Sequence, residues 1–148
     1  MVQLVLPNDT NPLGNVLGGT VMHWIDVAAA ITAHRHAHNI CVTASMDDLS
    51  FEAPIRMGQL AHLSARVTFT SNTSIEVQVD VEAEEMNSGK RRRTSTAFLT
   101  FVAIDEAGRP VPVPPLLVGP GDEEDHARAV VRRRDRLNRR AERGARPA

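Results

Sequence analysis

The stretch Asn15–His38, NVLGGTVMHWIDVAAAITAHRHAH, is the only long helical pattern before the C-terminal tail of this 148-residue chain. It opens on the glycine pair Gly18 and Gly19 and has no other Gly and no Pro. At 1.5 Å per residue, a helix of this length spans about 30 Å, roughly the diameter of a small domain. We therefore expect the rest of the fold to be organised around this helix.

The distribution of side chains around this helix predicts that it is buried. At 100° per residue, apolar side chains such as Val21, Trp24 and Ile25 cover most of the circumference, and Asp26 lies on a narrow polar stripe. A helix that is apolar around most of its circumference is normally buried. An ionised carboxylate at its border is costly unless it is hydrogen-bonded or reached by water. Asp26 is therefore a candidate functional residue.

After the helix, the apolar pattern changes to a period of two, which is typical of strands. Residues 40–47 predict a strand in which Ile40, Val42, Ala44 and Met46 share one face. The parity of the apolar residues then flips beyond residues 47–48, which predicts a β-bulge there. Three more strands are predicted over residues 61–69, 75–83 and 91–105.

Short turns separate the last three strands, so they predict an antiparallel meander. Because one face of each strand is apolar, the sheet needs a single apolar partner, and the long helix supplies it. The predicted fold class is α+β: a hot-dog fold in which a long antiparallel sheet wraps around one central helix. Residues 1–118 are expected to form this domain. Residues 119–148 are expected to form an Arg-rich helical tail.

The tail separates charges along its length. Four acids at residues 122–125 begin the predicted helix, and nine of the seventeen basic residues follow between Arg128 and Arg146. This order matches the helix dipole, and it indicates either a solvated helix or an anion contact. The run Lys90–Arg93 has the same two interpretations, a solvated sheet edge or a phosphate contact. With no Tyr and one Trp, the chain offers no aromatic platform for single-stranded nucleic acid.

The composition is ordinary for a globular protein, with 42% hydrophobic and 24% charged residues. The chain has no run of eighteen apolar residues and no secretory signal pattern, so we expect no membrane association and a cytoplasmic location. The single Cys41 is interpreted as a small packing residue. His34 and His38 share a helix face, but no further ligand cluster accompanies them, so no metal site is predicted.

The glycine pair and Asp26 form the main candidate for chemistry. The N–H groups of the first helical turn can stabilise an oxyanion, and Gly18 and Gly19 permit unusual backbone angles and close approach. Asp26 can then act as general base or nucleophile, with Asn15 orienting water or substrate. In the alternative interpretation, the glycines only form a tight turn and Asp26 caps a neighbouring backbone group.

Several segments in order resemble the hot-dog acyl-CoA thioesterases of the cytosolic acyl-CoA hydrolase type. The matching segments are residues 9–11 with 14–19, 22–26, 42–51, 68–76 and 97–102. The resemblance implies hydrolysis of fatty acyl-CoA to free acid and CoA, with no cofactor, because CoA belongs to substrate and product. It also implies a homodimer with shared sites, in which Asp26 of one subunit works with Asn15 of the other, and further assembly as a trimer of dimers. Gly19 is the third candidate catalytic residue, through the oxyanion site at the helix start.

The resemblance also implies a set of substrate-binding residues. Gly18 lies beside the thioester carbonyl, and strand and turn groups meet the pantetheine amides. Arginines bind the nucleotide phosphates, since their forks suit phosphate geometry. The implied CoA contacts are Ala44, Ser45, Met46, Thr73, Ser74, Arg132, Arg133 and Arg134.

Two other functions stay open at this point. A hot-dog dehydratase acting on hydroxyacyl thioesters would need a histidine base, and only His23 is close to Asp26 in sequence. A non-catalytic module that binds acyl-CoA, or RNA through the Arg-rich tail, would need no catalytic residue. Binding of RNA to such a module would fall steeply with salt.

Overall fold

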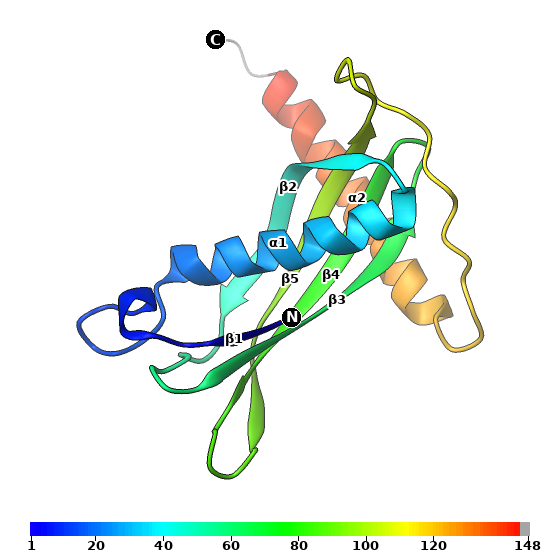
Figure 1. Ribbon diagram of the computed structural model, residues 1–148. Coiled ribbons are helices and arrows are strands. Elements are labelled where there is room, and N and C mark those ends of the chain that lie inside the picture. The colour runs from blue at the N-terminus through cyan, green and yellow to red at the C-terminus, as the bar shows by residue number, and fades with distance from the viewer. Residues whose placement is uncertain (146–148) are drawn as a thin grey trace.

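The computed structural model describes residues 1–145 as one antiparallel sheet with a helix on each face (Figure 1). The five strands run in the order β1-β3-β4-β5-β2. The predicted central helix and the meander β3-β4-β5 are confirmed. Residues 146–148, including Arg146 of the predicted tail, lie outside the described residues. The elements are β1 (Val2–Leu4), a 3-10 turn (Pro7–Asp9), α1 (Gly18–Ala37), β2 (Ile40–Phe51), β3 (Leu60–Thr70), β4 (Ser74–Glu84), β5 (Arg91–Ile104) and α2 (Glu123–Gly144).

Helix α1 crosses the inner face of the sheet and forms the core with it (Figure 1). Its buried face is rich in alanine, which lets the helix approach the strands closely, and Trp24 and Ile25 supply most of its bulk. The facing strand residues are large and fully buried, among them Ile75, Leu99 and Phe101. The helix ends at Ala37, and the φ of 53° at the capping residue His38 is left-handed, which stops the helical path.

Strand β2 contains the predicted bulge and a second one. Asp48 has a φ of 54°, and the pairing with β5 shifts between Asp47 and Ser50, as expected from the sequence. A further shift falls between Thr43 and Ser45, so that Ala44 is the extra residue. This second bulge was not predicted, because the apolar residues at 40, 42, 44 and 46 form an unbroken alternation in the sequence.

The bulge at Ala44 corrects the predicted faces of β2. Cys41 and Met46 pack against the core, whereas Ile40 and Val42 are exposed. The sequence placed Ile40, Val42 and Met46 on one face, and this is wrong because one extra residue reverses the alternation along a strand.

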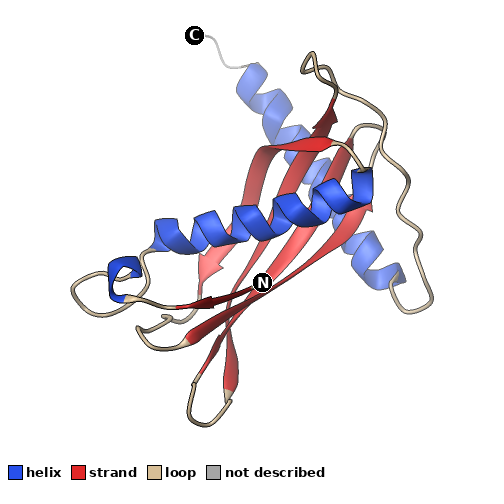
Figure 2. Cartoon of the chain, viewed as in Figure 1, coloured by secondary structure: helices blue, strands red, loops and turns tan. Residues whose placement is uncertain are grey.

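The proline-rich segment after β5 is an extended strap (Figure 2). Val111 N–H donates to Ala103 O at 2.9 Å, and Val113 N–H donates to Asn72 O at 2.9 Å. His36 Nε2 lies 2.7 Å from Pro114 O, which connects the strap to the last turn of α1. The strap carries the chain around the end of the sheet to its outer face, where α2 begins.

Helix α2 covers the outer face of the sheet instead of standing free in solvent. Ala129 of the helix is fully buried, His126 stacks on Phe69 with ring centroids 5.5 Å apart, and Arg132 lies 3.8 Å above the ring of Phe98. Of the two interpretations of the tail, a solvated helix therefore describes only its outward side. The inward side is part of the folded unit.

Candidate functional site

Asp26 lies two turns into α1, partly buried, beside strand β2. Its Oδ1 accepts a hydrogen bond of 2.7 Å from the hydroxyl of Thr43. Within residues 1–145 it accepts no bond from a backbone N–H, so it is not a cap. Strand β2 is an edge of the sheet, which leaves one side of the Asp26–Thr43 pair open to another molecule.

The start of α1 has two N–H groups that lack partners among the described residues, those of Gly18 and Gly19. Leu17 is the N-cap, no side chain caps the helix, and no acid stands in its first turn. Because the helix dipole places partial positive charge there, this end attracts an anion or a developing oxyanion.

The structure corrects the expected reason for the two glycines. Neither Gly18 nor Gly19 has a positive φ, so neither supplies an unusual backbone angle. A Cβ at Gly18 would lie 3.4 Å from the ring of Phe51, whereas one at Gly19 would meet nothing within 4 Å. Of the two expected properties of the glycines, only close approach remains. At Gly18 the ring of Phe51 approaches the backbone, and at Gly19 the space beside the backbone is open to another molecule.

Asn15 lies beside this helix start. It lines a cleft of about 330 Å³ with Gly18, Phe51 and the buried Ser95, among other residues. Its backbone N–H donates to the side chain of Asn11 at 3.2 Å, and its carbonyl accepts from Asn11 N–H at 2.8 Å. Asn11 therefore shapes the loop that positions Asn15, a role that the sequence analysis did not identify.

The helix start and Asp26 of one chain are too far apart to act on one carbonyl. Gly19 and Asp26 are separated by seven residues, which is about 10 Å along a helix axis. Reacting atoms must come within about 3–3.5 Å of each other. Within a single chain these two groups therefore cannot meet at one carbonyl.

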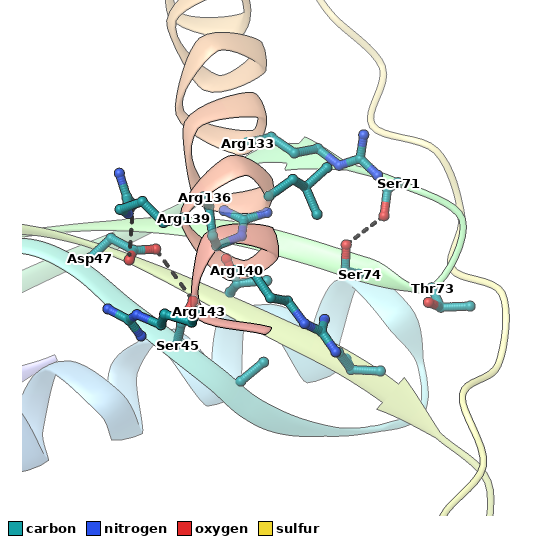
Figure 3. Close-up of a pocket in the computed structure, with 14 residues that line it drawn as sticks. Ser45, Asp47, Ser71, Thr73, Ser74, Arg133, Arg136, Arg139, Arg140 and Arg143 are labelled. Carbon is teal, nitrogen blue, oxygen red and sulfur yellow. Dashed lines mark hydrogen bonds and ion pairs between the residues drawn. The ribbon is translucent and has the colours of Figure 1, made fainter. Parts of the chain in front are cut away.

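A second cleft, of about 530 Å³, lies between α2 and the sheet; we call it the arginine cleft (Figure 3). Five of the predicted CoA contacts meet there: Ala44, Ser45, Thr73, Ser74 and Arg133. Its other basic residues and Ser71 were not predicted from the sequence. Helical spacing was the available signal for three of its four other arginines, because positions three, seven and ten residues beyond Arg133 share its side of α2. The missed arginines are Arg136, Arg139, Arg140 and Arg143.

Four predicted binding residues lie outside the arginine cleft. Met46 packs against the core, and Gly18 lines the cleft at the start of α1. Arg132 points at Glu76, with Nη2 and Oε1 2.7 Å apart, because its position on α2 faces the sheet. Arg134 lies on the solvent side of α2, where its Nε is 3.7 Å from Asp135.

The arginine cleft carries excess positive charge. Arg139 lies 3.5 Å from Asp47, and Arg136 lies 3.9 Å from Glu76. Arg133, Arg140 and Arg143 form no ion pair within the described part of the chain. Burial lowers the pKa of Arg136, and Glu76 opposes that shift. Such a cluster binds an anion with several charges, because arginine forks match phosphate oxygens.

A hydroxyl in the same cleft is also available. Thr100 is only 6% exposed, and its Oγ1 is buried without a hydrogen-bond partner among residues 1–145. Unpaired buried hydroxyls are uncommon, since each costs about 1–3 kcal/mol. A ligand in the arginine cleft can supply the missing partner.

The remaining candidate groups show no site of their own. Residues 1–145 contain no cluster of three or more His, Cys, Asp or Glu side chains arranged to hold a metal. Burial raises the pKa of the Cys41 thiol, which keeps the thiol protonated and agrees with a packing role. The basic run predicted as a solvated edge or phosphate contact pairs within the sheet, with Arg91 Nε 3.4 Å from Glu84. Neither helix of the described chain meets the length and hydropathy of a membrane span.

Residues 13–90 match the family described as the thioesterase superfamily. The chain belongs to that superfamily. This thioesterase is 43% identical over 138 residues to the uncharacterized acyl-CoA thioester hydrolase YkhA of Bacillus subtilis, covering 91% of this chain and 79% of the relative. It is 42% identical over 126 residues to the rat (Rattus norvegicus) cytosolic acyl coenzyme A thioester hydrolase. That match covers 84% of this chain but 33% of the rat protein, so the chain spans about a third of it.

Solved structures confirm the hot-dog fold of this thioesterase. An apo-hexameric acyl-CoA thioesterase superposes with a TM-score of 0.91 at 40% identity, covering 95% of this chain and 91% of the other. The acyl-CoA hydrolase of Staphylococcus aureus, in complex with butyryl coenzyme A, coenzyme A and coenzyme A disulfide, gives 0.90 at 34% identity. There the coverage is 97% of this chain and 88% of the other.

Three alanine variants of the Staphylococcus aureus enzyme replace an aspartate, an asparagine and a threonine. In its numbering the asparagine precedes the aspartate by 15 residues and the threonine follows it by 17. In this thioesterase, Asn11 and Thr43 stand at the same two separations from Asp26, whereas Asn15 precedes Asp26 by only 11 residues.

Proposed function

We propose that this thioesterase hydrolyses acyl-CoA thioesters at sites shared between two copies of the chain. Each site combines the start of α1 from one copy with Asp26 and Thr43 from the other. The carrying observation is the separation of these two half-sites by about 10 Å along one helix. The exposed edge of β2 beside Asp26 gives the second copy a strand to pair with.

The helix start polarises the thioester. The N–H groups of Gly18 and Gly19 donate to the carbonyl oxygen, and they hold it more strongly as it becomes an oxyanion. Asp26 of the other copy takes a proton from water as the water oxygen bonds to the carbonyl carbon, or it attacks that carbon directly. The carbon–sulfur bond then breaks, and CoA leaves as the thiolate and gains a proton. On the water route this releases the free acid; on the direct route it leaves an anhydride between the acyl group and Asp26, which a water molecule hydrolyses to release the acid and restore the carboxylate.

We propose that Asn11, Asp26 and Thr43 act together in the proposed site. Their separations equal those of the three residues altered in the Staphylococcus aureus enzyme. Thr43 holds the carboxylate of Asp26 through the 2.7 Å bond, and Asn11 sets the loop that carries Asn15 to the helix start. This assignment adds Asn11 and Thr43 to the residues predicted from sequence.

The arginine cleft is proposed to bind the nucleotide of CoA. Its arginines suit the phosphates, and the hydroxyls of Ser45, Thr73 and Ser74 suit the pantetheine amides. The existence of hexameric relatives supports assembly as a trimer of dimers. The name of the rat relative supports a cytoplasmic location.

A thiol-release assay over a series of acyl-CoA chain lengths tests the proposed activity. We expect turnover at one or more chain lengths, and a loss of about 10²–10⁴-fold in kcat for Asp26→Asn. The control is Asp105→Asn, which alters a carboxylate in the turn after β5. Full turnover by Asp26→Asn would show that the assignment of Asp26 is wrong. Salt-steep RNA binding without thioester turnover would identify a binding module instead.

A further inference from the structure

Glu76 is a buried carboxylate between β4 and α2, and the proposed reaction does not use it. Only 3% of the residue is exposed. Its Oε1 accepts hydrogen bonds from the Thr68 hydroxyl at 2.7 Å and from Arg132 Nη2 at 2.7 Å, and its Oε2 lies 3.2 Å from Arg132 Nε. Two bonds from one guanidinium fix orientation as well as charge. Glu76 therefore holds Arg132 in a single arrangement.

Arg132 is consequently unavailable to a ligand. Its fork is occupied by Glu76, and the face of its guanidinium rests on the ring of Phe98 at 3.8 Å. Removing the carboxylate would leave a buried positive charge without a partner, which is strongly unfavourable. The pair thus connects the outer face of the sheet to α2 at one defined position.

One turn further along α2, Arg136 connects this pair to the arginine cleft. Its Nη1 lies 3.9 Å from Glu76 Oε2, and it lines the cleft together with Arg133 and Arg140. Arginines gathered this closely repel one another. The negative charge of Glu76 lies beneath them and offsets part of that repulsion before any ligand arrives.

The rotation of α2 decides where the cleft arginines point (Figure 3). With side chains, a helix has a radius of about 5–6 Å, so a rotation of about 20° moves the side-chain ends by about 2 Å. Charge-assisted bonds to phosphate need distances of about 2.7–2.9 Å. Such a rotation would therefore break them. Contacts on Arg132 and Arg136 fix the rotation for Arg140 and Arg143 as well, because α2 is one continuous helix over Glu123–Gly144.

From this geometry we propose that Glu76 is a positioning residue for recognition of the CoA nucleotide. It holds Arg132 and Arg136, and thereby sets the arginine side of α2 against the arginine cleft. The inference rests on the proposed binding of the CoA phosphates in that cleft. It predicts that Glu76 affects the binding of the nucleotide part of the substrate and has no effect on the rate of hydrolysis at the thioester.

The test compares two substrates that share an acyl group, an acyl-CoA and the corresponding acyl-pantetheine, which has no phosphate. For Glu76→Gln we expect KM for the acyl-CoA to rise about 10-fold or more, the loss associated with a charged hydrogen bond, with kcat within about twofold. We expect kcat/KM for the acyl-pantetheine to be unchanged. An equal loss on both substrates, or no change on either, would overturn the proposal.

Asp80→Asn is the matched control. Asp80 is an acid on the same strand, bonded to the Thr96 hydroxyl at 2.7 Å and lying 4.0 Å from Arg93, with no bond or ion pair to α2. Asp80→Asn removes the same charge without altering a contact to Arg132 or Arg136. KM and kcat for both substrates should therefore equal those of the unaltered protein. A rise in KM for acyl-CoA equal to that of Glu76→Gln would show that the effect does not depend on contact with Arg132 and Arg136, and would refute a positioning role.

Two further measurements keep the outcome decisive. If Glu76→Gln does not fold, Thr68→Val removes one bond to Glu76 and retains its charge, and it should raise KM for acyl-CoA in the same selective way. Calorimetry with adenosine 3′,5′-bisphosphate separates the two proposals, because it needs no turnover. Binding that weakens in Glu76→Gln supports positioning even if no thioester is hydrolysed, whereas unchanged binding refutes it.

Discussion

At the scale of single residues, the Asp26–Thr43 bond is the feature that no sequence pattern contains. The two residues are 17 positions apart, on α1 and on β2, and they meet only because β2 returns along the helix. A carboxylate held by a hydroxyl has one oxygen fixed while the other stays available. Asp26 therefore has the restricted orientation that a general base or a nucleophile needs.

Thr43→Val should separate this positioning from stability. Loss of a hydrogen bond to a charged group costs about 1.5–3 kcal/mol, so we expect kcat to fall by about 10–100-fold with KM little changed. The measurement is the thiol-release assay at saturating acyl-CoA. Thr32→Val is the control, because Thr32 lies on α1 with Asp26 but donates to Ala28 O at 3.0 Å. If kcat falls equally in both variants, the hydrogen bond between Thr43 and Asp26 makes no specific contribution to catalysis.

Gly19→Ala distinguishes a functional glycine from a structural one. The residue has an ordinary φ, and a Cβ there would meet nothing within 4 Å of the chain, so Tm should be unchanged or slightly higher. A substrate approaching the N–H group would nevertheless meet the added methyl group, and kcat/KM should fall by about 10-fold or more. Thermal unfolding and thiol release on the same sample measure both effects. An unchanged kcat/KM would exclude this N–H group from the site.

At the scale of elements, local periodicity predicts most of the fold and fails where the partner of an element matters. The helix at Gly18–Ala37 and the meander could be predicted because each pattern lies within one segment. The rotation of α2 could not, since it depends on Glu76, which is 56 residues before Arg132. The contiguous Arg132–Arg134 run is therefore divided by the structure, with only Arg133 in the arginine cleft.

Mutations can test whether the arginines of α2 in the arginine cleft differ in function from those on its solvent side. We expect Arg140→Ala combined with Arg143→Ala to raise KM for acyl-CoA by about 10-fold or more, because each phosphate contact is charge-assisted. Added salt should weaken the remaining binding less steeply than in the unaltered protein. Arg134→Ala, on the solvent side of α2, should leave KM unchanged. Equal effects of the two sets would mean that only the overall charge of α2 matters.

The attachment of α2 should also depend on pH at its first turn. Hydrogen bonds from Arg66 and then Arg128 hold the pKa of Asp125 below its ordinary value. A carboxyl whose folded pKa is lowered adds stability above its unfolded pKa of about 3.9, and that stability is lost as pH falls through the folded pKa. Asp125→Asn should therefore lower Tm at pH 7 and lower it less at about pH 3, below the unfolded pKa. The same decrease at both pH values would contradict this origin.

At the scale of the whole molecule, one chain is half of the working unit that the proposed reaction requires. The inner face of the sheet is filled by α1 and the outer face by α2, so the remaining open surface beside Asp26 is the edge at β2. Pairing of two copies through a two-fold axis would bring each helix start toward the other copy's Asp26. The sequence could predict this division only through its resemblance to a family, because no local pattern records a contact between separate chains.

Mixing two inactive variants tests the shared site directly. Asp26→Asn removes the carboxylate half and Asn11→Ala removes the loop half, so each variant alone should be inactive as a homodimer. When equal amounts are unfolded and refolded together, half of the dimers contain one of each chain. In such a dimer one site has both halves intact and the other has neither, so activity should recover to about a quarter of the unaltered level. Refolding each variant alone is the control, and no recovery after mixing would show that each site lies within one chain.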